Sequence, residues 1–163
     1  MAMLVFLDFD GVLHPDEVYL HGKQVELRSN GQLFMWAPEL ITAIDGLDVQ
    51  IVLSTSWVRH LGFRKARKAL PEALSRLVIG ATWHSAMRLK EAGPQFLWDL
   101  QTRYEQIQTY LDRLPSTPRW CAIDDDVRGW PSGKRSHLID TAPGLGLSCV
   151  QAQGALRERL LQG

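Results

Sequence analysis

Three short apolar runs, each followed directly by polar residues, dominate the hydrophobic pattern of the chain. They are Met3–Leu7 (MLVFL), Val49–Leu53 (VQIVL) and residues 120–123 (WCAI), and they end in Asp-Phe-Asp-Gly, Ser-Thr-Ser and three aspartates. Short continuous runs are typical of strands buried on both faces, as in parallel sheets. Ligands bind at the carboxyl edge of such sheets, so the polar residues there are site candidates. Residues 77–80 and 138–139 are weaker strand candidates.

Four segments between and after these runs have the pattern of helices: 38–44, 63–70, 103–114 and 154–161. The third is the best defined, because Thr102 and Glu105 match the capping box that begins a helix. Residues 16–35 combine turn formers with Val/Tyr alternation, which indicates a flap or hairpin over the edge of the sheet. Alternating strands and helices predict an α/β fold, a three-layer Rossmann-like sandwich with a mainly parallel sheet. We expect one domain over residues 1–163.

Composition narrows the class of protein. Apolar residues make up 45% and charged residues 22%, and Lys+Arg and Asp+Glu both count 18. The balance gives no global positive field, so a nucleic-acid role needs a local patch. No apolar run is long enough to span a bilayer, and no signal-peptide pattern precedes the first strand. We therefore expect a cytoplasmic protein without a membrane partner, with Cys121 and Cys149 reduced and buried.

Two carboxylates follow the first run, and three follow the last. Asp8 and Asp10 can converge on one ligand if the chain leaves extended geometry there, which Gly11 allows. Phosphate esters are anionic, so an attacking aspartate needs a cation, and Mg²⁺ prefers carboxylate, water and phosphate oxygens. Carboxylates are known to act as nucleophiles through an aspartyl-phosphate. Adjacent aspartates beside a buried strand repel one another unless a cation or strong solvation offsets their charge.

The run Asp8-Phe-Asp10-Gly-Val-Leu resembles the first motif of the haloacid dehalogenase (HAD) superfamily, whose phosphatases carry Asp-x-Asp-Gly. The resemblance implies that Asp8 is the nucleophile and that Asp10 is the general acid and then the general base. It also implies that Asp8 and the backbone carbonyl of Asp10 bind Mg²⁺.

The second and third motifs of that superfamily have matches in the same order. A Ser or Thr that ends the next core strand binds the phosphoryl group there, which implies this role for Ser54, with Thr55 as the alternative register. Either hydroxyl could instead end the strand or cap the following helix. The third motif is a Lys or Arg that steadies the nucleophile and the phosphate charge. Arg103 is the candidate, with Lys90 as the alternative.

The fourth motif is an acidic pair that ends a strand, and Asp124-Asp125 resembles it. The resemblance implies that Asp124 is a direct Mg²⁺ ligand and that Asp125 is a second or water-mediated ligand. Whether Asp125 or Asp126 contacts the metal stays open at this point.

A closer resemblance covers most of the chain, from about Met3 to about Ser148. The runs DFDGVLHP, LSTSW, RYEQI, WCAIDDD and GLGLS are similar to compact HAD-type domains of bacterial RNA-repair fusion proteins. The intervals between the motifs are too short for a large cap domain, so we expect a minimal cap or none. The resemblance implies a Mg²⁺-dependent phosphohydrolase that forms an aspartyl-phosphate on a phosphorylated substrate, such as an RNA or DNA end. The alternative is a non-catalytic HAD-like module that binds nucleic acid or a protein.

Three further features each have a structural and a functional interpretation. His14 and His21 have no partner at metal-binding spacing, so packed or solvated side chains are expected. Trp57 follows the second motif directly, so it is either a packed side chain or the tryptophan that stacks against a base. Residues 59–68 form a dense basic run that is either a solvated helix face or a surface beside the site that attracts polyanions.

Overall fold

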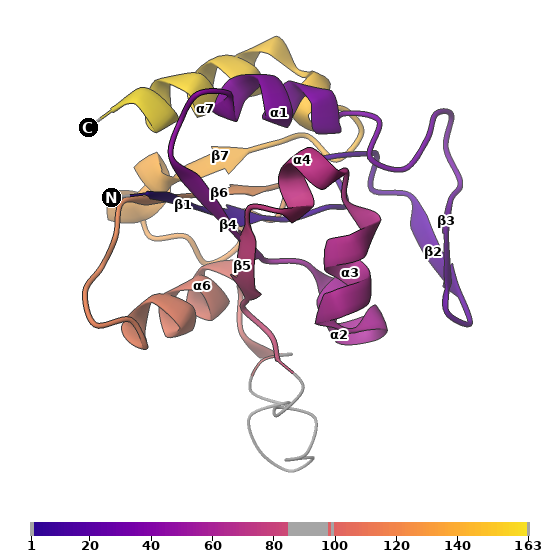
Figure 1. The fold of residues 1–163 in the computed structure, drawn as a ribbon, viewed down its shortest axis with the longest axis horizontal. Helices are drawn as coiled ribbons and strands as arrows, with labels where there is room; N and C mark the ends of the chain where they lie inside the picture. The colour runs from indigo at the N-terminus through magenta and orange to yellow at the C-terminus, as the bar shows by residue number, and fades with distance from the viewer. Residues whose placement is uncertain (1, 85–97, 99, 163) are drawn as a thin grey trace.

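A five-stranded parallel sheet forms the centre of the molecule (Figure 1). The computed structural model describes residues 2–84, 98 and 100–162. The strands are β1 (Met3–Leu7), β4 (Val49–Leu53), β5 (Val78–Ala81), β6 (Trp120–Asp124) and β7 (Leu138–Asp140). The predicted α/β fold is confirmed, and β1 and β4 have the bounds expected from their apolar runs.

The order of the strands, β5-β4-β1-β6-β7, creates a switch point beside β1. The chain moves outward from β1 through β4 to β5 and then continues on the other side of β1 with β6 and β7. In open sheets of this kind, ligands bind where the direction reverses, outside the carboxyl ends of the strands. That point lies between β1 and β6.

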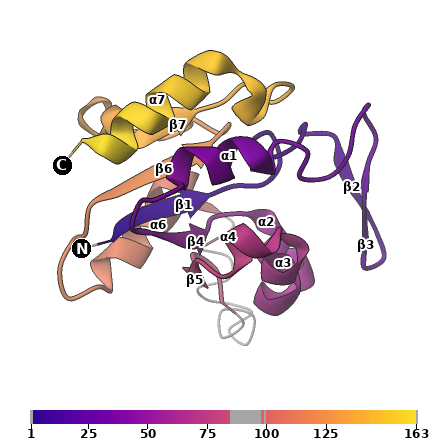
Figure 2. The ribbon, with the colours of Figure 1, turned by 45° about the horizontal axis from the view of Figure 1, so that its top comes forward.

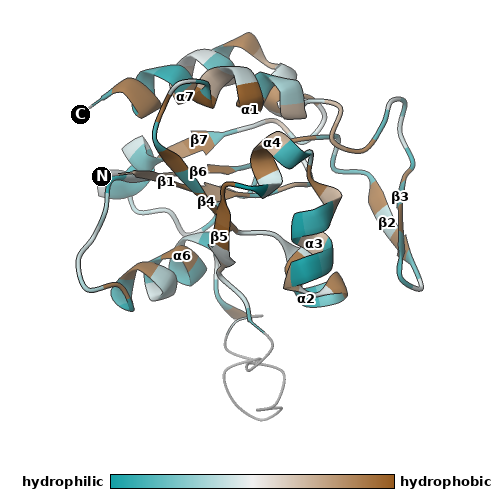
Figure 3. Ribbon diagram, viewed as in Figure 1, coloured by the Kyte–Doolittle hydropathy of each residue, from teal (hydrophilic) through white to brown (hydrophobic). Residues whose placement is uncertain are grey.

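Alternate side chains of the strands face two separate apolar layers. Val5 and Leu7 point toward α1 (Ala37–Ile44) and α7 (Val150–Leu161), whereas Phe6 points toward α6 (Arg103–Asp112). The apolar residues therefore concentrate on the strands and on the inner faces of the helices, as Figure 3 shows. The result is the predicted three-layer sandwich.

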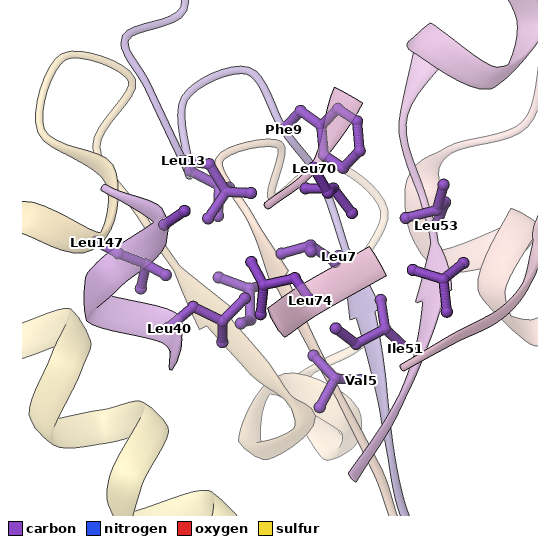
Figure 4. Close-up of a cluster of buried hydrophobic side chains, with 14 of the residues drawn as sticks. Val5, Leu7, Phe9, Leu13, Leu40, Ile51, Leu53, Leu70, Leu74 and Leu147 are labelled. Atoms are coloured by element: carbon purple, nitrogen blue, oxygen red, sulfur yellow. The ribbon is translucent and has the colours of Figure 1, made fainter. Parts of the chain in front are cut away.

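The larger layer is a continuous aliphatic cluster (Figure 4). Leu40 of α1, Leu147 and Leu74 meet Val5 and Leu7 of the central strand there, and all five are fully buried. Burial of one such side chain contributes roughly 1.5–3 kcal/mol. This cluster fixes β1 and therefore the position at which the following loop begins.

Helix boundaries differ from the expectations at two places. The basic helix predicted over 63–70 is α3 (Phe63–Ala69), and a separate helix α2 (Ser56–Leu61) precedes it, with a break at Gly62 at φ 88. The last helix begins at Val150 and not near residue 154. Burial of Ala152 and Leu156 against the core extends this helix through a glycine, so packing overrides propensity. A short helix α4 (Glu72–Ser75) follows Pro71.

The segment 16–35 contains an antiparallel hairpin of β2 (Val18–His21) and β3 (Gln24–Leu27), joined by a two-residue loop. This pair is not part of the central sheet. It projects beyond the end of the sheet on the side where α2 and α3 lie (Figures 1 and 2).

Both cysteines are free thiols. Cys121 is buried, and burial raises the pKa of its thiol to about 12. The expectation that Cys149 is buried as well is wrong, because it precedes the exposed first turn of α7 and is only partly covered. Within the described part of the chain, no helix is both long and apolar enough to cross a membrane.

Candidate active site

Three polar residues meet at the carboxyl edge of the central strands. The register pairs Leu7 with Leu53 of β4 and with Ile123 of β6. The next residue on each strand, Asp8, Ser54 and Asp124, therefore lies at the same level. Backbone hydrogen bonds continue this alignment, because Asp8 N donates to Ile123 O (3.1 Å) and Ser54 N donates to Leu7 O (2.8 Å). The expectation that the strand ends bring these three residues together is confirmed.

Asp8 is held at the start of a tight loop. It is 3% exposed, and its Oδ1 accepts a hydrogen bond from Phe9 N at 2.8 Å. Gly11 turns the chain with φ 77, and a Cβ there would lie 2.3 Å from Oδ2 of Asp125. Only glycine combines this backbone geometry with so close an approach. The loop after β1 therefore packs closely against the carboxylate of Asp125.

Asp8, Asp124 and Asp125 form an acidic cluster in which one carboxylate oxygen of each lies within 4.8 Å of the others. Burial, and then the charge of Asp124, raises the pKa of Asp8 well above its usual value. Burial likewise raises the pKa of Asp124, and burial together with the charge of Asp124 raises that of Asp125 to about 7. Carboxyl groups so close together cannot all ionise without a compensating cation.

Arg103, the first residue of α6, reaches all three strand ends. Its Nη1 donates to Ser54 O at 2.6 Å, its Nη2 lies 3.7 Å from Asp8 Oδ1, and its Nε lies 3.7 Å from Asp124 Oδ2. The Thr102 hydroxyl accepts from Glu105 N and caps the helix, which confirms the predicted start of the helix at Arg103. The Arg103 guanidinium therefore bridges two members of the acidic cluster, Asp8 and Asp124, and the backbone of Ser54. Lys90, the alternative third-motif residue, lies outside the described residues.

The crevice above these groups is strongly acidic. It has a volume of ≈ 360 Å³ and is lined by Asp8, Asp10, Asp16, Ser56, Arg103, Asp125 and Asp126. Among these lining residues, Arg103 is the single cation against five carboxylates. An anionic phosphate could not enter such a crevice without additional positive charge.

A family model described as the HAD domain in Swiss Army Knife RNA repair proteins matches residues 4–152. The chain belongs to this HAD family. No curated protein and no solved structure gave a significant match. The resemblance drawn from the sequence motifs is thereby confirmed, and membership supports a HAD-type hydrolase in general terms.

The donor set of this HAD domain fits a hard divalent cation. Asp124 is completely buried, yet its Oδ2 accepts no hydrogen bond from the residues that the structure describes. An orphaned carboxylate oxygen is costly in a buried position. Mg²⁺ takes oxygen ligands of this type, and Asp8, Asp124 and Asp125 could supply them. Asp126 is engaged elsewhere, since its carboxylate binds the guanidinium of Arg128 at 2.8 and 2.9 Å.

The two hydroxyls of the second motif have different surroundings. Thr55 Oγ1 accepts from Trp57 N at 3.3 Å and so caps α2. Ser54 Oγ is enclosed and has no hydrogen-bond partner within the described chain. Of the two, Ser54 is the one whose hydroxyl is not already used as a helix cap, but it lies beneath the crevice and does not line it. Ser56, which sequence reasoning missed, lines the crevice directly.

Asp10 is positioned by two side chains. Its Oδ1 accepts from Trp57 Nε1 at 2.9 Å and lies 2.8 Å from His14 Nε2. His14 Nδ1 accepts from Phe34 N at 3.1 Å, which assigns the proton to Nε2 and makes His14 a donor to Asp10. The Asp10 carboxylate lies outside the acidic cluster of Asp8, Asp124 and Asp125.

Phe34 completes this arrangement from the end of the hairpin segment. Its φ of 61 is unusual for a bulky residue. The ring packs edge-on against Phe9 at 5.2 Å and against His14 at 5.1 Å, and it contacts Trp57 at 5.3 Å. These contacts stabilise the strained backbone that directs Phe34 N at His14. His14 was expected to be packed or solvated, and it is packed, with its ring directed at the candidate acid/base.

Asp16 is the other residue of the crevice that the sequence motifs did not single out. It lies beyond the first motif, and burial followed by the charge of Asp10 raises its pKa. No local signal marks it, because the turn that brings it over the site depends on a backbone hydrogen bond to Pro143 O.

Proposed function

We propose that this HAD domain is a Mg²⁺-dependent phosphohydrolase that forms an aspartyl-phosphate on Asp8. The observation that carries the proposal is the convergence of Asp8, Asp124 and Asp125 within 4.8 Å at the switch point of the sheet. Bound there, Mg²⁺ would offset the negative charge shared by these carboxylates and the phosphate.

In the first half-reaction, a carboxylate oxygen of Asp8 attacks phosphorus. The new bond joins Asp8 to phosphorus, and the bond between phosphorus and the ester oxygen breaks. Oδ1 of Asp8 is held by Phe9 N and faces Arg103, which leaves Oδ2 for the attack. Asp10 donates a proton to the departing oxygen.

In the second half-reaction, water attacks the aspartyl-phosphate. Asp10, now ionised, takes a proton from this water as the new phosphorus–oxygen bond forms and the bond to Asp8 breaks. Arg103 and the hydroxyl of Ser54 donate hydrogen bonds to the phosphoryl oxygens in both steps. The products are inorganic phosphate and the alcohol, and Asp8 is restored.

The substrate that we propose is a phosphorylated nucleic-acid end. Membership in a family of HAD domains from RNA repair proteins supports this substrate class.

The test measures phosphate release from glycerol 2-phosphate and from 5′- and 3′-phosphorylated oligonucleotides, with Mg²⁺ and with EDTA. We expect turnover only with Mg²⁺, and its loss in Asp8→Asn without a change in the far-UV circular dichroism spectrum. Asp112→Asn, which changes an exposed carboxylate of α6, is the control and should retain full activity. Rapid acid quench with a labelled substrate should place the phosphate on the peptide that contains Asp8. Full activity of Asp8→Asn, or label on another residue, would overturn the mechanism.

A further inference from the structure

Three hollows lie side by side along the hairpin and α2. The acidic crevice shares Asp10 and Ser56 with a second hollow, and the second shares His60 and Leu61 with a third. We call the second the apolar pocket and the third the basic end. These shared wall residues place the three hollows in a row that leads away from Asp8, and we call this row the groove.

The apolar pocket lies between two elements. Val18, Leu20 and Val25 of the hairpin form one wall, and Trp57 and Leu61 of α2 form the other. Leu20 is 45% exposed, so an apolar side chain faces an open hollow there. The volume of ≈ 230 Å³ is below the roughly 300–1,000 Å³ of drug-sized ligand sites, and so suits a single small group.

The basic end continues this groove between the tip of the hairpin and α3. Lys23, His60 and Lys65 line it, and all three are exposed. Lys65 Nζ donates to Lys23 O at 3.0 Å, which ties α3 to the hairpin. Residues 56–70 hold five Lys or Arg and no Asp or Glu. The ribbon of α3 is largely teal in Figure 3, which marks its hydrophilic residues.

The order of chemistry along the groove repeats the order of groups in a nucleotide chain. A phosphate at Asp8 is followed by an apolar pocket that Trp57 lines and then by cations. Single-stranded nucleic acid binds proteins through a positively charged groove and through contacts of its bases with aromatic side chains. A peptide does not carry this regular alternation of a planar group and a negative charge.

We propose that the groove binds a single-stranded polynucleotide whose phosphorylated end lies at Asp8. The terminal base occupies the apolar pocket beside Trp57, and the following phosphates contact Lys23 and Lys65. This inference rests on the proposed function, and it adds that the protein contacts the terminal base and the phosphates that follow it.

The first experiment compares kcat/KM for phosphorylated hexanucleotides and for glycerol 2-phosphate. The double variant Lys23→Ala/Lys65→Ala should lower the value for the hexanucleotide at least tenfold and leave that for glycerol 2-phosphate within twofold. The slope of log(kcat/KM) against log[KCl] should become shallower by about 1.4, since each phosphate contact contributes about 0.7 for a single strand. Lys134→Ala/Arg157→Ala removes two exposed cations outside the groove. It should change neither kcat/KM for the hexanucleotide nor the salt slope.

A second variant tests the apolar pocket. Leu20→Asp places a charge on the exposed hairpin wall. It should raise KM for a mononucleotide several-fold and leave glycerol 2-phosphate unaffected. Comparison of kcat/KM for RNA and DNA hexanucleotides of the same sequence shows whether the strand is RNA or DNA.

Binding separates this inference from the proposed function. Fluorescence anisotropy with an unphosphorylated hexanucleotide in EDTA needs neither metal nor turnover. Weaker binding to Lys23→Ala/Lys65→Ala, but not to Lys134→Ala/Arg157→Ala, supports the groove even if no ester is hydrolysed. Equal binding to both double variants overturns the groove, and hydrolysis of glycerol 2-phosphate would then still support the phosphohydrolase.

Discussion

Two neighbouring side chains fix the orientation of the Asp10 carboxylate. Trp57 Nε1 and His14 Nε2 both donate to Oδ1, so the second oxygen is left for a proton transfer. The same network extends through His14 to the backbone of Phe34. A general acid must stay within hydrogen-bond reach of the leaving oxygen, so this network determines how well Asp10 performs its proposed role.

Trp57→Phe should therefore lower kcat and change KM little. The variant keeps an aromatic ring but removes one donor to a carboxylate, a hydrogen bond that contributes about 1.5–3 kcal/mol. If this energy is used to position Asp10, kcat falls about 10- to 100-fold. Steady-state kinetics on a phosphate ester measure the effect.

Trp130→Phe is the matched control for this substitution. Trp130 is 8% exposed and Trp57 is 6% exposed, so both variants shorten a buried ring. The indole Nε1 of Trp130 donates no hydrogen bond within the described chain. Its variant should retain wild-type kcat, and an equal loss in both variants would show that Trp57 acts through packing alone.

At the scale of elements, the loop after β1 and helix α7 each contain a glycine, for opposite reasons. Gly11 has a positive φ and approaches the Asp125 carboxylate too closely for any side chain. Gly154 lies within α7 with open space around it. The same substitution, Gly to Ala, should therefore change stability in opposite directions at the two positions.

Gly11→Ala should destabilise the fold by ~1–3 kcal/mol, the range for a residue forced into a sparsely populated backbone region. It should also weaken Mg²⁺ binding, because Asp125 must move away from the added methyl group. Gly154→Ala should stabilise by ~0.5–1 kcal/mol through better helix propensity. Urea denaturation measures both, and calorimetry measures the metal affinity. A Gly11→Ala protein that binds Mg²⁺ like the wild type would contradict the account of the loop.

The elements that could be predicted from the sequence are those whose pattern depends on burial alone. β1 is apolar throughout and β4 at every position except the exposed Gln50, because the rest of both strands is buried, and their bounds follow from the composition of the run. The break at Gly62 and the early start of α7 could not be predicted. Both depend on contacts with the rest of the fold, such as the burial of Ala152, and not on the local pattern.

The residues of the candidate site also fall into those that could be predicted from the sequence and those that could not. Asp8, Ser54 and Asp124 could be placed from the sequence, because parallel strands bring the residues after their carboxyl ends to one edge. Ser56 and Asp16 could not, since their positions depend on the start of a short helix and on the path of a loop. The distinction between Ser54 and Thr55 needed the observation that Thr55 caps α2.

For the whole molecule, a formal net charge of zero conceals a strong separation of charge. The acidic crevice lies at one end of the proposed groove, and Lys23 and Lys65 lie at the other. Each carboxyl of the acidic cluster has a pKa raised above 3.8 in the folded chain. Between pH 4 and pH 7 the folded state therefore binds more protons than the unfolded state, and folding stability without metal falls as the pH rises.

The free energy of unfolding in EDTA should thus be highest near pH 4–5 and should decrease toward pH 7, the region in which Asp125, with a pKa of about 7, loses its proton. Asp126, whose pKa the Arg128 guanidinium lowers, acts in the opposite direction only below about pH 4. Mg²⁺ requires ionised ligands, so it should raise the Tm strongly at pH 7.5 and little at pH 5. Asp125→Asn should flatten the profile in EDTA and reduce the effect of Mg²⁺, whereas Asp112→Asn should change neither. Thermal scans over this pH range measure both effects. If stability in EDTA rises steadily from pH 4 to pH 7, these carboxylates do not form the metal site. The same conclusion follows if Mg²⁺ shifts the Tm equally at pH 5 and pH 7.5.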